Sequence, residues 1–188
     1  MQATIIGTIA QRELLDAMRS RLIGVFAVVF GIFALALSYF GLIGAGYAEM
    51  TGFAKTTASL LNLVLILVPL IALFLGTTSM TSETGALELL LSQPVTRAEV
   101  VLGKFLGLSL TLIASTLCGF GGAGVIIGLR TGGADLGRYL ALTGLACVLG
   151  VAFIGIALLV AVLAGTRIRA LGAAVAVWFF SIILYDLL

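Results

Sequence analysis

The chain has 188 residues, of which 62% are hydrophobic and only 10% are charged. Soluble domains average about 45–50% apolar and about 25% charged residues, so an ordinary water-soluble domain is excluded. Ten Lys and Arg against eight Asp and Glu leave a net charge of +2. The basic residues are scattered rather than clustered, which argues against a nucleic-acid surface, and the partner we expect is the lipid bilayer.

Residues suited to catalysis or metal binding are scarce. The chain has no histidine, so the commonest general base and metal ligand is missing. Cys118 and Cys147 stand apart in apolar stretches without a C-x-x-C pair, and we expect them to pack as small apolar side chains. The four methionines are dispersed and offer no series of soft ligands for copper. We therefore predict no catalytic residue, no metal site and no cofactor in this chain.

Residues 10–21 have the composition of a helix that precedes the first long apolar stretch. At about 100° per residue the two sides of this helix differ, which makes it amphipathic. Spacings of three and four residues allow weak ion pairs from Arg12 to Asp16 and from Asp16 to Arg19. One side carries Arg12, Glu13, Asp16 and Arg19, and the other carries Ala10, Leu14, Ala17 and Met18. Two uses stay open: a helix lying in the membrane interface, or a docking surface for another protein.

Five stretches are long and apolar enough to cross a bilayer, which needs about 20 residues per helix. No internal repeat or polar linker separates them, so the sequence predicts one domain over residues 1–188 with an all-α fold, a polytopic bundle of membrane helices. The last stretch reaches Leu188 without a closing polar flank, and we expect the natural chain to continue. The predicted spans cover residues 22–45, 60–78, 97–129, 139–165 and 170–188.

The orientation follows from the basic residues, because short basic loops stay on the cytoplasmic side. Seven Lys and Arg lie in the segments on the N-terminal side of the membrane and three lie in the opposite loops. This bias predicts a cytoplasmic N-terminus. The seven are Arg12, Arg19, Arg21, Arg97, Lys104, Arg167 and Arg169, and the three are Lys55, Arg130 and Arg138.

The cytoplasmic loop between the second and third spans has a pattern of its own. Residues 82–94 read S-E-T-G-A-L-E-L-L-L-S-Q-P, which predicts a short helix stopped by a proline. Thr96-Arg97-Ala98-Glu99 then matches the S/T-x-x-E capping box, so a new helix should begin at about Arg97. Two helices meeting at Pro94 can form a rigid protrusion that passes a push into the third span. The same composition also fits a re-entrant or interfacial segment.

Few polar groups lie within the predicted spans. Lys104 is expected to extend toward the cytoplasmic headgroups. Asn62 and Asp186, near the outer ends of their spans, are candidate polar residues of a transport path. Gly103 and Gly107 have a small-xxx-small spacing, as do the glycines at 124 and 128. Close packing within the chain and a face between two copies are both open interpretations.

Two of these blocks resemble the permeases of ABC-2-type exporters. Residues 9–21, I-A-Q-R-E-L-L-D-A-M-R-S-R, are similar to the amphipathic helix before the first span of those permeases. Residues 83–97, E-T-G-A-L-E-L-L-L-S-Q-P-V-T-R, followed by G-K-F at 103–105, are similar to the family signature E-x-G-T-L-E-x-L-L-S-x-P-x-x-R…GK-F. With V-W-F-F at 177–180 and Y-D at 185–186, the pattern most resembles the permease of the nitrous oxide reductase maturation system.

The resemblance implies a bundle of six spans, one more than the five predicted here, in the cytoplasmic membrane of a bacterium or archaeon. It implies that residues 82–94 form a coupling helix in a groove of an ATP-binding subunit, flanked by the N-terminal docking residues Arg12, Glu13, Asp16 and Arg19. Two permease copies would pair around the transport route, and an extracytoplasmic maturation protein would be a further partner. The implied ATPase-coupling residues are Glu83, Gly85, Leu87, Glu88, Leu91, Gln93, Pro94 and Arg97.

The chain contains no G-x-x-x-x-G-K-[ST] motif, so ATP and magnesium are expected in a partner chain. We therefore predict a permease subunit without enzymatic activity of its own. The alternative is a non-transporting membrane scaffold that recruits a cytoplasmic partner. A secondary transporter is disfavoured because no inverted repeat is visible. The cargo stays open between a lipid, a small sulfur-containing species, and mechanical force passed to an extracytoplasmic partner.

Overall fold

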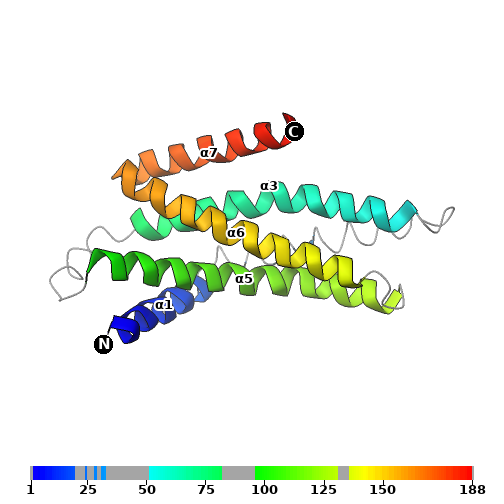
Figure 1. Ribbon diagram of the computed structural model, residues 1–188, viewed down its shortest axis with the longest axis horizontal. Coiled ribbons are helices and arrows are strands. Elements are labelled where there is room, and N and C mark those ends of the chain that lie inside the picture. Colours follow the sequence, from blue (N-terminus) through cyan, green and yellow to red (C-terminus); the bar gives the residue numbers. More distant parts are fainter. Residues whose placement is uncertain are drawn as a thin grey trace.

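A computed structural model describes residues 2–19, 24, 28, 31–32, 51–81, 96–130 and 136–187. Within these ranges the fold is all-helical, with no strand. The helices are α1 (Gln2–Arg19), α3 (Thr51–Thr81), α5 (Arg97–Arg130), α6 (Leu136–Ala164) and α7 (Arg167–Leu187). Figure 1 shows α3, α5 and α6 running lengthwise side by side, with α7 against α3 and α1 against α5.

Four of these helices are long and apolar enough to cross a membrane: Leu61–Thr81, Ala98–Gly121, Gly137–Ala164 and Arg167–Tyr185. They correspond to the second to fifth predicted spans. The predicted first span, 22–45, lies outside the described residues apart from positions 24, 28, 31 and 32, which are helical. Helices α6 and α7 each begin three residues before the predicted starts of their spans, residues 139 and 170. The helical backbone extends beyond the apolar stretch from which each span was predicted.

The core is built from apolar side chains of α3, α5 and α6. Val68, Leu112 and Ile154 are each 1% exposed or less and belong to one contiguous cluster. A Cβ at Gly150 would overlap the side chain of Leu112, and one at Gly76 would overlap Ala157. Glycines therefore let α6 approach α3 and α5 closely, as small residues do in membrane bundles.

The turn between α6 and α7 depends on Gly165, whose φ of +68° is left-handed backbone that favours glycine. Its amide donates to the Ala161 carbonyl and so ends α6 with a left-handed cap. The Thr166 carbonyl accepts from Ala170 and begins α7. Because the turn is this short, α7 returns beside α3 (Figure 1).

The two cysteines do not pack in the core. Cys118 is exposed at the protein surface and Cys147 is half-buried. The expectation of burial is therefore wrong for Cys118, which lies on an outward-facing part of α5, whereas Cys147 of α6 is partly buried.

Candidate functional site: a polar junction where three helices meet

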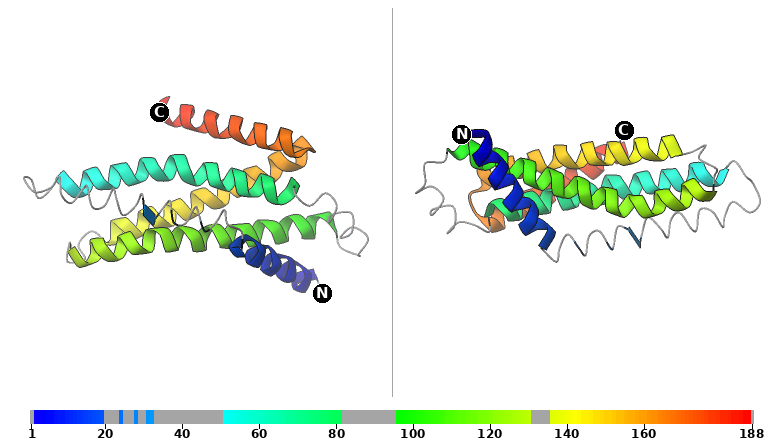
Figure 2. Two further views of the ribbon diagram at one scale, coloured as in Figure 1. Left: turned by 180° about the vertical axis from the view of Figure 1, so that it is seen from behind. Right: turned by 90° about the horizontal axis from the view of Figure 1, so that it is seen from below.

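Helix α1 lies obliquely across the first half of α5, as the views in Figures 1 and 2 agree. Its contact face includes Ala10, which is buried. A Cβ at Gly107 of α5 would lie 2.6 Å from the Cβ of Glu13 and 2.7 Å from the carbonyl oxygen of Ala10. The backbones of α1 and α5 therefore touch at Gly107. Of the two uses considered for this glycine, packing within the chain is the one observed.

Three polar side chains meet inside this contact, and we call them the polar junction: Glu13 of α1, Ser79 of α3 and Lys104 of α5. The Lys104 ammonium donates to Oε2 of Glu13 at 3.3 Å, to Oγ of Ser79 at 3.1 Å and to the Ser79 carbonyl at 3.1 Å. The Ser79 hydroxyl in turn donates to Oε1 of Glu13. The lysine and the carboxylate thus hold each other directly and through the same serine.

The polar junction corrects two sequence-based expectations. Lys104 does not extend to the headgroups, because its side chain is only 3% exposed and ion-paired with Glu13. Glu13 does not belong to a solvated charged face, because its side chain is 13% exposed and points into the bundle. It stands three residues after Ala10 on the helix, within about 60° of the buried face, and this angle was the available signal. Ser79 was missed altogether, since a serine near a helix end is unremarkable in a sequence.

The outward side of α1 keeps its predicted character. Arg12 and Asp16 form an ion pair at 3.7 Å, with side chains 70% and 60% exposed. The side chain of Arg19 lies outside the described residues, so its pairing with Asp16 stays a prediction. Leu15 is 48% exposed between these charges. The outer face of α1 therefore mixes charged and apolar groups, which fits both the membrane interface and a contact with another protein.

The capping box is confirmed at the start of α5. The backbone amide and the hydroxyl of Thr96 each donate to Oε2 of Glu99 at 2.8 Å, and the Glu99 amide points back to the Thr96 hydroxyl at 3.4 Å. Helix α5 begins at Arg97, as the motif predicts. Lys104 stands seven residues further on, about 10 Å along the helix axis.

The predicted coupling residues fall mostly outside the described residues. This holds for all of those in the segment 82–94 and for the side chain of Arg97. The segment connects the last residue of α3, Thr81, to the capped start of α5. It therefore joins the same ends of α3 and α5 that the polar junction connects to α1.

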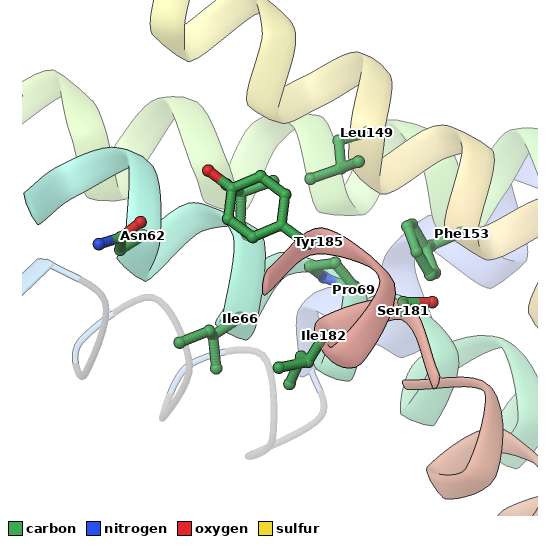
Figure 3. Close-up of a pocket in the computed structure, with 9 residues that line it drawn as sticks. Asn62, Ile66, Pro69, Leu149, Phe153, Ser181, Ile182 and Tyr185 are labelled. Carbon is green, nitrogen blue, oxygen red and sulfur yellow. The ribbon is translucent and has the colours of Figure 1, made fainter. Parts of the chain in front are cut away.

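Asn62, one of the two candidate polar residues of a transport path, lines a pocket of about 330 Å³ between α3, α6 and α7. Figure 3 shows Tyr185 pointing from α7 toward α3 and α6 across this pocket. The walls are apolar apart from Asn62, Ser181 and Tyr185. The side chain of Asp186 lies outside the described residues. The transport-path role of Asn62 and Asp186 stays a prediction.

Helix α3 carries Pro69 beside this pocket, and a proline removes one intrahelical donor and disturbs the carbonyls of the preceding turn. The carbonyl of Ile66, in that turn, accepts a hydrogen bond from the indole of Trp178 at 2.9 Å. This contact connects α7 to α3 at the proline. Among the described residues, no three His, Cys, Asp or Glu side chains lie close enough together to hold a metal ion.

Comparison with known proteins agrees with this architecture. The model of a protein family described as ABC-2 family transporter protein matches residues 7–188, which is nearly the entire chain. The chain belongs to this ABC-2 family. It is thus the permease component of an ABC system and a multi-pass membrane protein.

Two relatives are both described as "probable ABC transporter permease protein NosY". The protein of Pseudomonas aeruginosa is 35% identical over 189 residues, which covers 97% of this chain and 69% of the relative. The protein of Stutzerimonas stutzeri is 33% identical over 188 residues, which covers 97% of this chain and 68% of the relative. The resemblance to ABC-2 permeases inferred from the two sequence blocks is confirmed.

Proposed function

We propose that this ABC-2 permease passes the ATP-driven motion of a separate ATP-binding subunit into its membrane helices. The supporting observation is the placement of α1. It packs on α5 at the end of the bundle where residues 82–94 connect α3 to α5, and it presents Arg12 and Asp16 outward. A subunit that binds residues 82–94 would meet this face of α1 at the same time.

In this proposal the N-terminus and residues 82–94 are cytoplasmic, in the cytoplasmic membrane of a bacterium or archaeon. Two permease copies pair around the transport route. The system serves nitrous oxide reductase maturation together with an extracytoplasmic maturation protein, as the sequence resemblance implies. The two relatives described as permease NosY support the permease role. ATP and magnesium are held by the partner subunit.

The test is to purify the protein together with the neighbouring ATP-binding protein in lipid nanodiscs. ATP hydrolysis is measured for the complex and for the ATP-binding protein alone. Glu83→Ala and Gly85→Pro should weaken the complex or abolish the permease-dependent part of the hydrolysis. Arg138→Ala is the control, because this exposed charge lies in the first turn of α6, at the opposite end of the bundle from residues 82–94.

A stable complex whose hydrolysis depends on residues 83 and 85 would support coupling. If the ATP-binding protein binds but the rate of permease-dependent ATP hydrolysis is the same in these variants, the scaffold alternative replaces coupling. If no ATP-binding protein binds, the proposed docking face is wrong.

A further inference from the structure

We propose that the polar junction of Glu13, Ser79 and Lys104 is a positioning element that makes α1, the end of α3 and the start of α5 move as one rigid body. This inference rests on the proposed function and deepens it, because it names the residues that would carry motion from the docking face into the membrane. They are positioning residues and do not touch ATP or cargo.

The first argument is the number and direction of the hydrogen bonds. A lysine ammonium has three donors, and the described contacts of Lys104 include three acceptors, one from α1 and two from Ser79 of α3. Ser79 also donates to Glu13, so α1 is held by both of the helices that flank residues 82–94. Displacing α1 relative to either helix must break at least one charge-assisted hydrogen bond, which is stronger than a neutral one.

The second argument is burial. The side chains of the Lys104–Glu13 pair are 3% and 13% exposed, whereas those of the Arg12–Asp16 pair on the same helix are 70% and 60% exposed. An exposed pair exchanges freely with water and holds nothing in place. A buried pair has no water to replace a lost partner, so separating it leaves charges in a poorly polarisable interior. The junction therefore resists small separations that an exposed pair would permit.

The third argument is the neighbouring close contact. Gly107 follows Lys104 by three residues, so both lie on one face of α5. At Gly107 the backbone of α1 touches α5, and a Cβ would lie within 2.7 Å of Ala10. The lysine fixes α1 by polar contacts and the glycine fixes it by shape, one helical turn apart. The two contacts share Glu13 on α1 and lie about one turn apart on α5, so together they oppose sliding of α1 along α5.

The variants must separate positioning from simple stability. Glu13→Met with Lys104→Met removes both charges together and keeps long side chains, so no unpaired charge stays buried. Ser79→Ala removes only the hydroxyl that connects the pair. Ser115→Ala is its matched control, because this buried hydroxyl of α5 donates only to a carbonyl of its own helix in the described contacts.

The decisive measurement is a distance between α1 and α5 by paired spin labels at Gln11 and Leu110, which are both exposed. Cys118 and Cys147 are first replaced by alanine so that only the labelled positions react. The permease is studied in nanodiscs in complex with the ATP-binding subunit, nucleotide-free and trapped with ATP and vanadate. Permease-dependent ATP hydrolysis is recorded on the same samples.

In the otherwise unmodified chain the Gln11–Leu110 distance should be the same in both states. In the double methionine variant the complex should still form, the distance should change with nucleotide, and permease-dependent hydrolysis should fall at least threefold. Ser79→Ala should show a smaller effect of the same kind, and Ser115→Ala none. If the junction served only as a structural anchor, its removal would not make the Gln11–Leu110 distance depend on nucleotide.

A nucleotide-dependent distance in the unmodified chain would refute the rigid body. An invariant distance with full hydrolysis in the double variant would refute the role of the junction and leave the proposed function standing. If the double variant does not fold, Ser79→Ala decides by the same criteria. If the unmodified chain binds no ATP-binding subunit, the proposed function fails first, and this inference fails with it.

Discussion

Replacing Lys104 by methionine alone should destabilise the protein much more than replacing Lys104 and Glu13 together. The single change leaves the Glu13 carboxylate, which is 13% exposed, with Ser79 as its remaining partner among the described residues. Removing one partner of a buried ion pair costs about 3–5 kcal/mol in unfolding free energy. The remaining access to water places Lys104→Met at the lower end, about 3 kcal/mol.

The double variant removes both charges, and replacing a buried pair by apolar side chains is often neutral or stabilising. We expect its unfolding free energy to lie within about 1 kcal/mol of the parent. The sum of the two single effects should then exceed the double effect by more than about 2 kcal/mol. Met is unbranched and flexible, so it can fill the space of both side chains without forcing α1 away.

The assay is equilibrium unfolding in mixed micelles of increasing denaturing detergent, followed by two probes. Trp178, the single tryptophan, reports on the contact of α7 with α3. A fluorophore at Gln11 reports on α1. In Lys104→Met, the unfolding transition reported by the fluorophore at Gln11 should occur at a much lower concentration of denaturing detergent than the transition reported by Trp178. The reasoning is refuted if Lys104→Met is as stable as the parent, or if the double variant is as unstable as the single one.

Three further outcomes follow from local contacts. Thr96→Ala removes both hydroxyl hydrogen bonds of the capping box, should destabilise the start of α5 by about 1 kcal/mol, and should speed amide hydrogen exchange there but not in α6. Gly150→Ala should lower the thermal midpoint because its Cβ would overlap a leucine of α5, whereas Gly144→Ala, with open space around it, should raise it. Trp178→Phe loses the bond to the Ile66 carbonyl and should cost about 1 kcal/mol in the same unfolding assay.

The membrane helices and the start of α5 could be predicted because their causes are local. A run of apolar residues predicts a span by itself, and a threonine three residues before a glutamate can form a capping box without any distant partner. The observed helix α5 accordingly begins at Arg97. The end of α6 is predicted to within one residue, at Gly165, whereas its start is placed three residues late, because the helix begins at Leu136, before the apolar stretch.

The polar junction could not be predicted because its partners are far apart in the sequence. Lys104 is 91 residues from Glu13 and 25 from Ser79, and nothing in one sequence selects these partners among other acceptors. For a lone lysine near the end of an apolar helix, extension to the headgroups is the usual outcome. Here a carboxylate from an amphipathic helix takes the place of the headgroups, which requires α1 to pack on protein.

The direction of Glu13 bears on the two uses considered for α1. A helix that only lies in the membrane interface keeps its carboxylates toward water, because turning one inward costs desolvation. Glu13 points inward, while Asp16, three residues later, points outward and pairs with Arg12. The inward carboxylate holds α1 at one place on α5 through Lys104, and the outward charges are left for a partner. A helix fixed on one side and charged on the other is suited to receiving a force and passing it on, which is the role that the proposed coupling to an ATP-binding subunit requires.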